Sequence, residues 1–115
     1  MLYKIFHNPR CKKSKAGLEY LKTKTQNIDI RYYLEEPITR DEIREILLKS
    51  NLKPLEIVRT QEEYFKSYLK GKSFTDDEWI IILSENPKLI QRPIVVGKYK
   101  AVVGNSNSQI DKLIK

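Results

Sequence analysis

The sequence predicts an α/β fold in which a helical insertion interrupts a mixed β-sheet, and three observations lead to this prediction. An apolar stretch at residues 2–6 precedes a helical pattern and then a second stretch rich in β-forming residues. Helical patterns then fill most of the chain between about residues 36 and 90. Two short runs of β-branched residues and a last helical pattern end the sequence. The expected order is β-α-β, a helical insertion, and β-β-α, in a single domain of 115 residues.

The first β-α-β unit is expected from strands at residues 2–6 and 28–34 and a helix from residue 14 to about residue 24. A strand, helix and strand in this order form a right-handed crossover, so the two strands should pair in parallel. Gly17 lies inside the predicted helix, where glycine costs about 1 kcal/mol relative to alanine. We therefore expect close packing of the helix against the sheet at Gly17.

The insertion is expected to begin with a helix that Thr39 caps, with Asp41 and Glu42 in its first turn. Further helical segments are expected at residues 53–59, 62–69 and 76–86. Trp79 supplies part of the apolar face of the last of them, and we expect its side chain in the core.

The end of the chain predicts an antiparallel hairpin of residues 94–96 and 101–103, followed by a helix from Ser106 or Asn107 onward. The single domain, residues 1–115, would then consist of a core at about 1–35 and 91–115 with a helical insertion at about 36–90.

Bulk composition limits the possible partners. The net charge of +7 favours anionic partners. Nucleic-acid binding is not indicated, because the only dense group of cations is at residues 10–15 and no aromatic residues are interleaved with them. No apolar run is long enough for a membrane span, and no leader pattern is present. One cysteine cannot form an internal disulfide, so we expect a reducing, cytoplasmic location. We expect neither a metal site nor a tightly bound cofactor.

The loop after the first strand holds the only cysteine of the chain, Cys11, at the start of a predicted helix. A helix N-terminus carries unpaired N–H groups and a partial positive charge, both of which stabilise a thiolate. Arg10, Lys12 and Lys13 add cations on both sides of the cysteine. The alternative is a small buried hydrophobic residue. The surrounding cations favour a reactive thiol, so Cys11 is our candidate nucleophile.

Three neighbours of Cys11 are candidates for shaping or activating it. The ring of His7, the only histidine, could donate a hydrogen bond to the sulfur or be structural. The hydroxyl of Ser14 could donate to the thiolate or satisfy local backbone groups. Asn8 is expected to shape the loop through an Asx-type turn.

The motif His-Asn-Pro-x-Cys-x-x-Ser at residues 7–14, directly after a strand, resembles the signature of the ArsC-type arsenate reductases. The resemblance continues at residues 55–59, 74–77 and 89–96, and thus covers nearly the whole chain. It implies a thioredoxin-like fold and a glutaredoxin- or glutathione-coupled arsenate reductase, with glutathione as a co-substrate. It also implies a small oxyanion such as arsenate as substrate.

The resemblance assigns roles to further residues. Arg92 and Arg59 match arginines that contact the oxyanion, and the position of Arg92 before a strand favours a place beside Cys11. An arginine can hold an oxyanion with two parallel N–H bonds. Pro93 matches the cis-proline of thioredoxin-like folds. The family's third arginine is replaced by Asn105, whose amide adds no charge, so we expect a weak arsenate reductase.

The function that these residues predict is a thiol-dependent oxidoreductase. The Cys11 thiolate attacks an oxyanion, and an external thiol resolves the adduct because the chain has no second cysteine. One alternative is a glutathione-dependent oxidoreductase that acts on an organic or mixed-disulfide substrate. Another is an Spx-like regulatory protein that binds RNA polymerase. Proteins of that type carry Cys-x-x-Cys, whereas Ser14 occupies the second position here.

Overall fold

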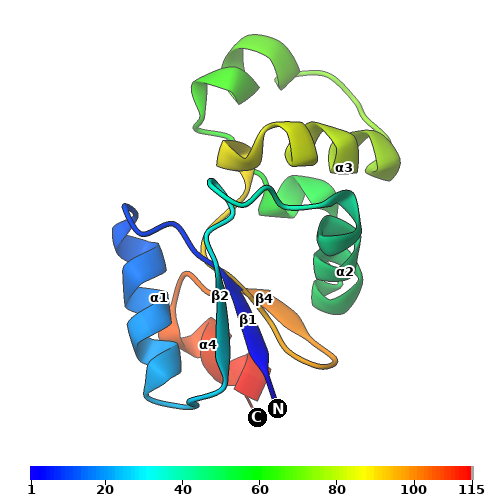
Figure 1. The fold of residues 1–115 in the computed structure, drawn as a ribbon. Coiled ribbons are helices and arrows are strands. Elements are labelled where there is room, and N and C mark those ends of the chain that lie inside the picture. Colours follow the sequence, from blue (N-terminus) through cyan, green and yellow to red (C-terminus); the bar gives the residue numbers. More distant parts are fainter. Residues whose placement is uncertain (115) are drawn as a thin grey trace.

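The computed structural model describes residues 1–114 and contains a four-stranded mixed sheet with helices on both faces (Figure 1). The α/β class expected from the sequence is therefore confirmed. The strands are β1 (Tyr3–Phe6), β2 (Ile28–Arg31), β3 (Ile94–Val96) and β4 (Ala101–Val103). The longer helices are α1 (Lys12–Lys22), α2 (Arg40–Ser50), α3 (Asp76–Glu85) and α4 (Asn107–Ile114).

The strand order β2-β1-β3-β4 makes β1 and β3 the two central strands, so two distant parts of the chain are neighbours in the sheet. β1 pairs in parallel with β2, as the sequence predicts, and antiparallel with β3, whose hairpin partner is β4. Because β1 and β3 run in opposite directions, the end of β1 meets the start of β3, with Phe6 opposite Ile94. The loop that follows β1 and holds Cys11 therefore lies at the same end of the sheet as the segment that precedes β3 and holds Arg92.

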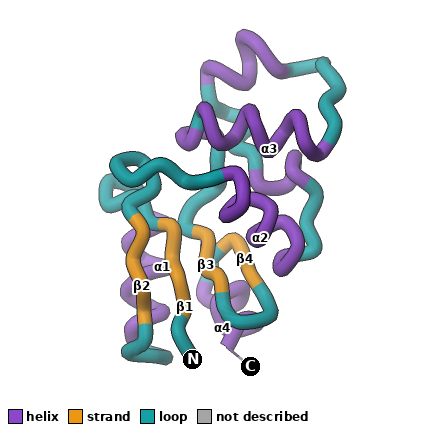
Figure 2. Tube along the Cα trace, turned by 45° about the vertical axis from the view of Figure 1, so that its right-hand side comes forward, coloured by secondary structure: helices purple, strands orange, loops and turns teal. Residues whose placement is uncertain are grey.

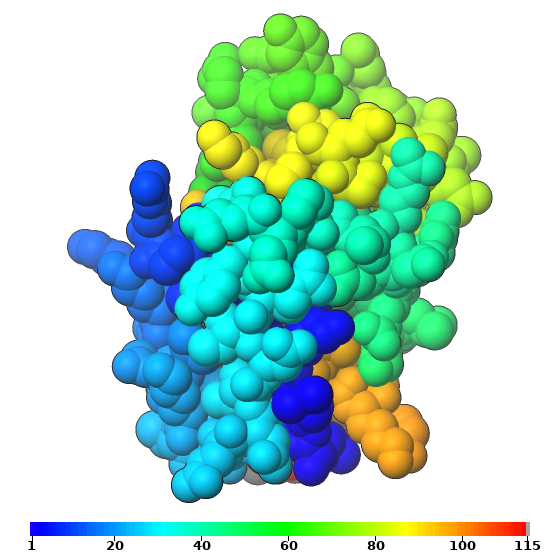
Figure 3. Space-filling model, viewed as in Figure 1, coloured from blue at the N-terminus to red at the C-terminus, as the bar shows by residue number. Residues whose placement is uncertain are grey.

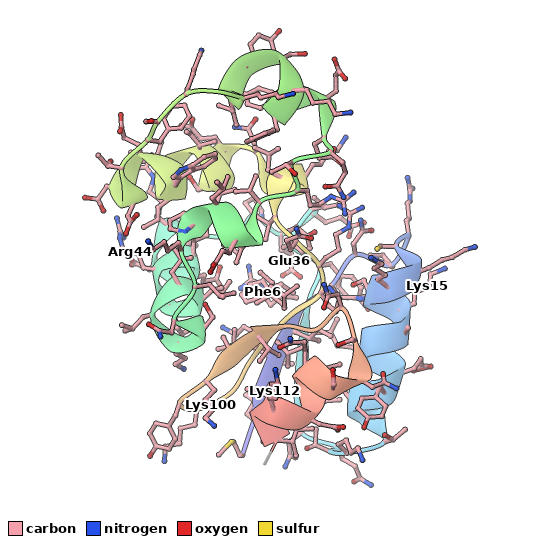
Figure 4. All side chains as sticks on the ribbon, turned by 180° about the vertical axis from the view of Figure 1, so that it is seen from behind. Phe6, Lys15, Glu36, Arg44, Lys100 and Lys112 are labelled. Atoms are coloured by element: carbon pink, nitrogen blue, oxygen red, sulfur yellow. The ribbon has the colours of Figure 1, made fainter. Side chains whose placement is uncertain are left out.

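The two faces of the sheet are covered by different helices (Figures 1 and 2). Ile5 of β1 packs in a cluster with residues of α1 and α4, whereas Phe6 packs in a cluster with residues of α2 and α3. This alternation follows from the two-residue repeat of a strand. Phe6 lies between the sheet and α2 in Figure 4. Trp79 is buried in the same cluster as Phe6, as expected.

The segment between α2 and β3 lies beyond the end of the sheet at which Cys11 is found. The N-terminus lies at the opposite end of the sheet (Figures 1 and 2). Besides α3 it contains the short helical turns η1 (Pro54–Ile57), η2 (Phe65–Leu69) and η3 (Pro87–Leu89). Its base is closed by a bridge between Val58 and Ile90. The backbone N–H of Arg59 also donates to the carbonyl of Leu89 at 2.6 Å.

Several predicted boundaries are wrong by a few residues. The second strand ends at Arg31 rather than residue 34, because its partner β1 ends at Phe6 and Tyr32 begins a turn. α1 begins at Lys12, two residues before the predicted start, because Cys11, with φ −98° and ψ 124°, is its N-cap residue. The expected helices at 53–59 and 62–69 are only the turns η1 and η2.

The start of α2 matches its prediction. The Thr39 side chain accepts from the backbone N–H of Glu42, whose carboxylate accepts in return from the Thr39 N–H. This reciprocal pair satisfies two donors at the helix start. Across residues 1–114, no helix has the length and apolarity needed to cross a membrane.

Candidate active site

Cys11 stands at the end of a short loop whose shape is set by Asn8. The Asn8 side-chain oxygen accepts from the N–H of Arg10 at 3.0 Å, which confirms the predicted Asx turn. Its backbone carbonyl accepts from the N–H of Cys11 at 3.1 Å. The first helical hydrogen bond then runs from Lys15 N–H to the carbonyl of Cys11. Cys11 is thus a half-buried free thiol at the mouth of α1.

The surroundings of Cys11 favour its thiolate. Burial alone would raise the pKa of the thiol, but Arg92 and the backbone N–H groups of Ser14 and Lys13 outweigh it, so the pKa is lowered. Cys11 occupies the N-cap position of α1, but its side chain accepts no hydrogen bond from the first turn of the helix. The N–H groups at the second and third helix positions are therefore left to the ionised sulfur.

His7 and Ser14 form a buried pair behind the cysteine. Nδ1 of His7 lies 2.8 Å from Oγ of Ser14, and that oxygen also accepts from the N–H of Asn8 at 3.0 Å. Of the two roles considered for the Ser14 hydroxyl, the structure shows the backbone-satisfying one. Two roles were open for His7, donation to the sulfur and a structural contact, and the structure shows its Nδ1 against Ser14. Activation of the thiolate by His7 stays a prediction, and Ser14 would transmit it.

The Lys charges near His7 act against its protonation. Burial lowers the pKa of the imidazole, and the charges of Lys22 and Lys15 lower it further. The side chain of Lys15 itself projects outward from α1 (Figure 4). His7 is therefore neutral at pH 7, and its imidazole nitrogen is suited to accept from or donate to a hydroxyl.

Arg92 reaches Cys11 because α1 packs tightly against the segment before β3. The peptide bond between Arg92 and Pro93 is cis, as the resemblance implies. A Cβ atom on Gly17 would lie 2.7 Å from Cγ of Pro93 and 2.8 Å from the carbonyl oxygen of Gly104. Only glycine permits this approach, which confirms the close packing expected at this position.

The interaction between Arg92 and Cys11 is mutual. Burial would lower the pKa of the guanidinium, yet hydrogen bonding to Cys11 and the negative forms of Tyr33, Cys11 and Glu62 raise it. The guanidinium therefore stays charged beside the sulfur. This is the arrangement that an attacking thiolate and an anionic substrate both require.

Arg59 is half-buried, and its charge acts on the hydroxyl of Tyr33. Its Nη2 and Nε atoms donate to one carboxylate oxygen of Glu62, at 3.1 and 3.3 Å. Glu62 therefore holds the Arg59 side chain and offsets part of its charge. Arg59 and Arg92 both act on the Tyr33 hydroxyl, so the two arginines border the same small region.

A model described as the ArsC family matches residues 6–113 of this sequence. The chain belongs to the ArsC family. It is 31% identical to a Neisseria meningitidis serogroup B protein named arsenate reductase, over 96% of this chain and 97% of that protein. It is 34% identical to the uncharacterized protein YfgD of Escherichia coli, over 96% and 95%.

The structure also resembles solved members of the ArsC family. An arsenate reductase from Vibrio cholerae matches with a TM-score of 0.90 at 32% identity, over 97% of each chain. These ArsC structures are thioredoxin-like, so the predicted fold is confirmed. The helices and sheet of this ArsC-family chain thus have the arrangement that the sequence order predicts.

The remaining candidates of this ArsC-family site lie farther out. The side chains of Arg10, Lys12 and Lys13 are exposed. The N-terminal part of the chain, in blue, lies beside the cyan segment that includes β2 and the residues after it (Figure 3). Asn105 is also exposed. It lines a groove of about 540 Å³ together with Gln91 and residues of α2, β4 and α4. Cys11 does not line this groove.

Tyr33 is a site residue that sequence reasoning missed. It follows β2 and is completely buried, and its hydroxyl faces Arg92. An aromatic residue in a predicted strand signals packing, so the sequence held no sign of a polar role. Over residues 1–114, no three His, Cys, Asp or Glu side chains group in a way that would hold a metal ion.

Proposed function

We propose that this protein is a thiol-dependent oxidoreductase of the arsenate reductase type. The observation that carries the proposal is the placement of the Arg92 guanidinium against the Cys11 sulfur at the N-terminus of α1. The names of the relatives from Neisseria meningitidis and Vibrio cholerae support arsenate as the substrate. The proposal assigns Cys11 as nucleophile and Arg92 and Arg59 as oxyanion-binding residues.

Binding of the oxyanion uses positive groups that are already in place. The guanidinium of Arg92 offers parallel N–H donors that match two oxygens of a tetrahedral anion. The N–H groups at the start of α1 offer further donors and a favourable dipole. Arg59 adds charge from the insertion, with Glu62 keeping it in position. A dianion would thus be bound before any bond is broken.

The first chemical step is a substitution at arsenic. The Cys11 thiolate forms an S–As bond, and one As–O bond breaks, with its oxygen leaving as water after protonation. Arsenic keeps its oxidation state in this step, because one bond to oxygen is only replaced by one bond to sulfur. Arg92 stabilises the negative charge on the remaining oxygens while the new bond forms.

The second step needs a thiol from outside the chain, because Cys11 is the only cysteine. A thiolate of glutathione or glutaredoxin forms an S–S bond with Cys11, and the S–As bond breaks with its electron pair staying on arsenic. Arsenate is thereby reduced by two electrons to arsenite. A further thiol releases Cys11 from the mixed disulfide, which suits the reducing cytoplasm.

The test is arsenate-dependent oxidation of NADPH, coupled through glutathione, glutaredoxin and glutathione reductase. We expect turnover with the wild-type protein and none with Cys11→Ser, while Ser14→Ala keeps part of the activity. Omitting glutaredoxin or glutathione in turn identifies the resolving thiol. Equal rates with and without arsenate would refute the proposal.

A second function is favoured by one observation, the uncharged side chain of Asn105. If the oxyanion site lacks its third cation, the same thiolate could instead exchange with an organic or glutathione mixed disulfide. The coupled assay distinguishes the two when a glutathionylated peptide replaces arsenate. Turnover with the peptide alone would assign the second function.

A further inference from the structure

Two buried polar atoms beside Cys11 lack a partner. Within residues 1–114, the Tyr33 hydroxyl and Nε of Arg92 are the buried side-chain polar atoms that make no hydrogen bond. Tyr33 has 0% exposed surface. Buried polar atoms are normally paired, and those that are not call for a specific explanation. Their place next to the nucleophile indicates that a ligand supplies the missing acceptor.

The ring of Tyr33 is held firmly, so its hydroxyl has a fixed position. It packs in the apolar cluster that contains Phe6, Val58 and Ile90. Val58 and Ile90 form the bridge at the base of the insertion, next in sequence to Arg59 and close to Arg92. Packing therefore fixes the hydroxyl within reach of the charges of both arginines before any substrate is bound.

The chemistry of its neighbours sets the role of this hydroxyl. A guanidinium contains only donors, so neither Arg92 nor Arg59 can accept the phenolic proton. Burial raises the pKa of Tyr33 despite the lowering effects of both arginines, so the phenol stays protonated at neutral pH. The anionic group that faces it is the Cys11 thiolate. The proton is thus available to an anion held at Cys11.

We propose that Tyr33 is a further catalytic residue, whose hydroxyl donates a hydrogen bond to the oxyanion attacked by Cys11. Nε of Arg92 donates to the same anion from beside it. The inference rests on the proposed function, since it needs an oxyanion at Cys11. The ligand at Cys11 would be a tetrahedral oxyanion, one oxygen of which accepts from the neutral Tyr33 hydroxyl. Tyr33 thereby supplies a contact in a site where Asn105 supplies no charge.

The test uses Tyr33→Phe, which removes only the hydroxyl, and Tyr99→Phe as the matched control at an exposed position of the β3–β4 hairpin. Arsenate is titrated against the rate at which iodoacetamide alkylates Cys11, without any added thiol. We expect Tyr33→Phe to raise the half-protecting arsenate concentration about ten- to a hundredfold, the usual effect of a hydrogen bond to a charged group. Tyr99→Phe should match the wild type.

Thermal unfolding separates this role from a structural one. Because the hydroxyl has no partner in the free protein, Tyr33→Phe should unfold no lower than the wild type without arsenate. It should gain less stability than the wild type when arsenate is added. A variant that unfolds at a clearly lower temperature, or fails to fold, would show a structural hydroxyl and overturn the inference.

The remaining outcomes distinguish the inference from the function on which it rests. Equal half-protecting concentrations for wild type and Tyr33→Phe would overturn the role of Tyr33 and leave the proposed function in place. If arsenate does not protect Cys11 of the wild-type protein at all, the oxyanion site itself is absent. Both the proposed function and the role of Tyr33 would then be rejected.

Discussion

The imidazole Nδ1 of His7 lies 2.8 Å from the hydroxyl oxygen of Ser14, and this buried contact ties the two ends of the Cys11 loop together. The same oxygen accepts from the N–H of Asn8. The loop is thus closed by side chains from its first and last residues. Since Cys11 lies between them, the position of its sulfur depends on a contact that does not include it.

Stability should depend on pH through His7. The pKa of His7 is lowered by burial and by Lys22 and Lys15, so the unfolded chain takes up a proton more readily than the folded protein. This contribution is fully present above the unfolded value of about 6.5 and is lost as the pH falls below it. We expect a lower melting temperature at pH 5.5 than at pH 7.5.

His7→Gln is the comparison, because His7 is the only histidine of the chain. The variant should be less stable at pH 7.5, since it lacks the contact with Ser14, but its melting temperature should change less between the two pH values. Parallel curves for wild type and variant would show that another group causes the dependence.

Arg92→Ala should raise the pKa of Cys11, because the variant loses the side chain that opposes the effect of burial. The rate of iodoacetamide alkylation against pH measures this midpoint. Arsenate turnover should fall at least ten- to a hundredfold, the usual result of losing a charge-assisted hydrogen bond. Arg44→Ala, an exposed arginine paired with Asp41, is the control. An unchanged midpoint in Arg92→Ala would contradict the described site.

Gly17→Ala should destabilise the protein despite a better helix propensity. The new Cβ would lie 2.8 Å from the Gly104 carbonyl oxygen, a backbone atom that cannot move freely. Overpacking of this kind costs about 1–3 kcal/mol, against a gain in propensity of about 1 kcal/mol. Alkylation of Cys11 should also slow, because Pro93 and Arg92 would shift.

The control for that prediction is Ala16→Gly, at an exposed position of the same helix. It should lower stability by about 1 kcal/mol through propensity alone and leave the alkylation of Cys11 unchanged. A Gly17→Ala protein as stable as the wild type would mean that α1 can retreat from Pro93. Urea unfolding and the pH dependence of alkylation provide both measurements.

Asn105→Arg should increase arsenate turnover about tenfold, because a third cation would share the charge of the adduct. The exposed Ser108→Arg adds the same charge nearby and serves as the control. A gain in Asn105→Arg alone indicates direct contact with the anion, and equal gains in both indicate a long-range charge effect. No gain in either would show that the site does not extend to the segment after β4.

Local patterns predicted the elements around Cys11 well. An apolar strand, a loop with Asn8 and Pro9, and a helix that starts beside the cysteine depend on interactions between near neighbours in sequence. The hairpin of β3 and β4 is equally local, and the close packing at Gly17 followed from the cost of glycine in a helix. These features are therefore readable without knowledge of the tertiary structure.

Other features depend on contacts between distant residues and could not be read in this way. β2 ends at Arg31 because β1 provides no further partner. The sequence of β2 itself contains no sign of this end. The hydroxyl of Tyr33 meets charged groups only in the folded chain, which brings Arg92 and the Arg59 of the insertion near it. The choice of Ser14 as the partner of His7 likewise follows from the folded loop.

The bridge between Val58 and Ile90 fixes the two ends of the long segment formed by residues 60–88. Residues 60–88 begin and end at this bridge, where Gln91 N–H also donates to the carbonyl of Ile57 at 2.8 Å, and α3 within them packs against α2 in the core. Doubling the length of a closed loop costs only about 0.6 kcal/mol. The exposed turn at residues 70–72 can therefore be lengthened while the base keeps Arg92 at the cysteine, whereas Trp79, Ile80 and Leu83 of α3 belong to the core and must stay. For protein engineers, this exposed turn is a place to graft new recognition elements onto a thiol enzyme.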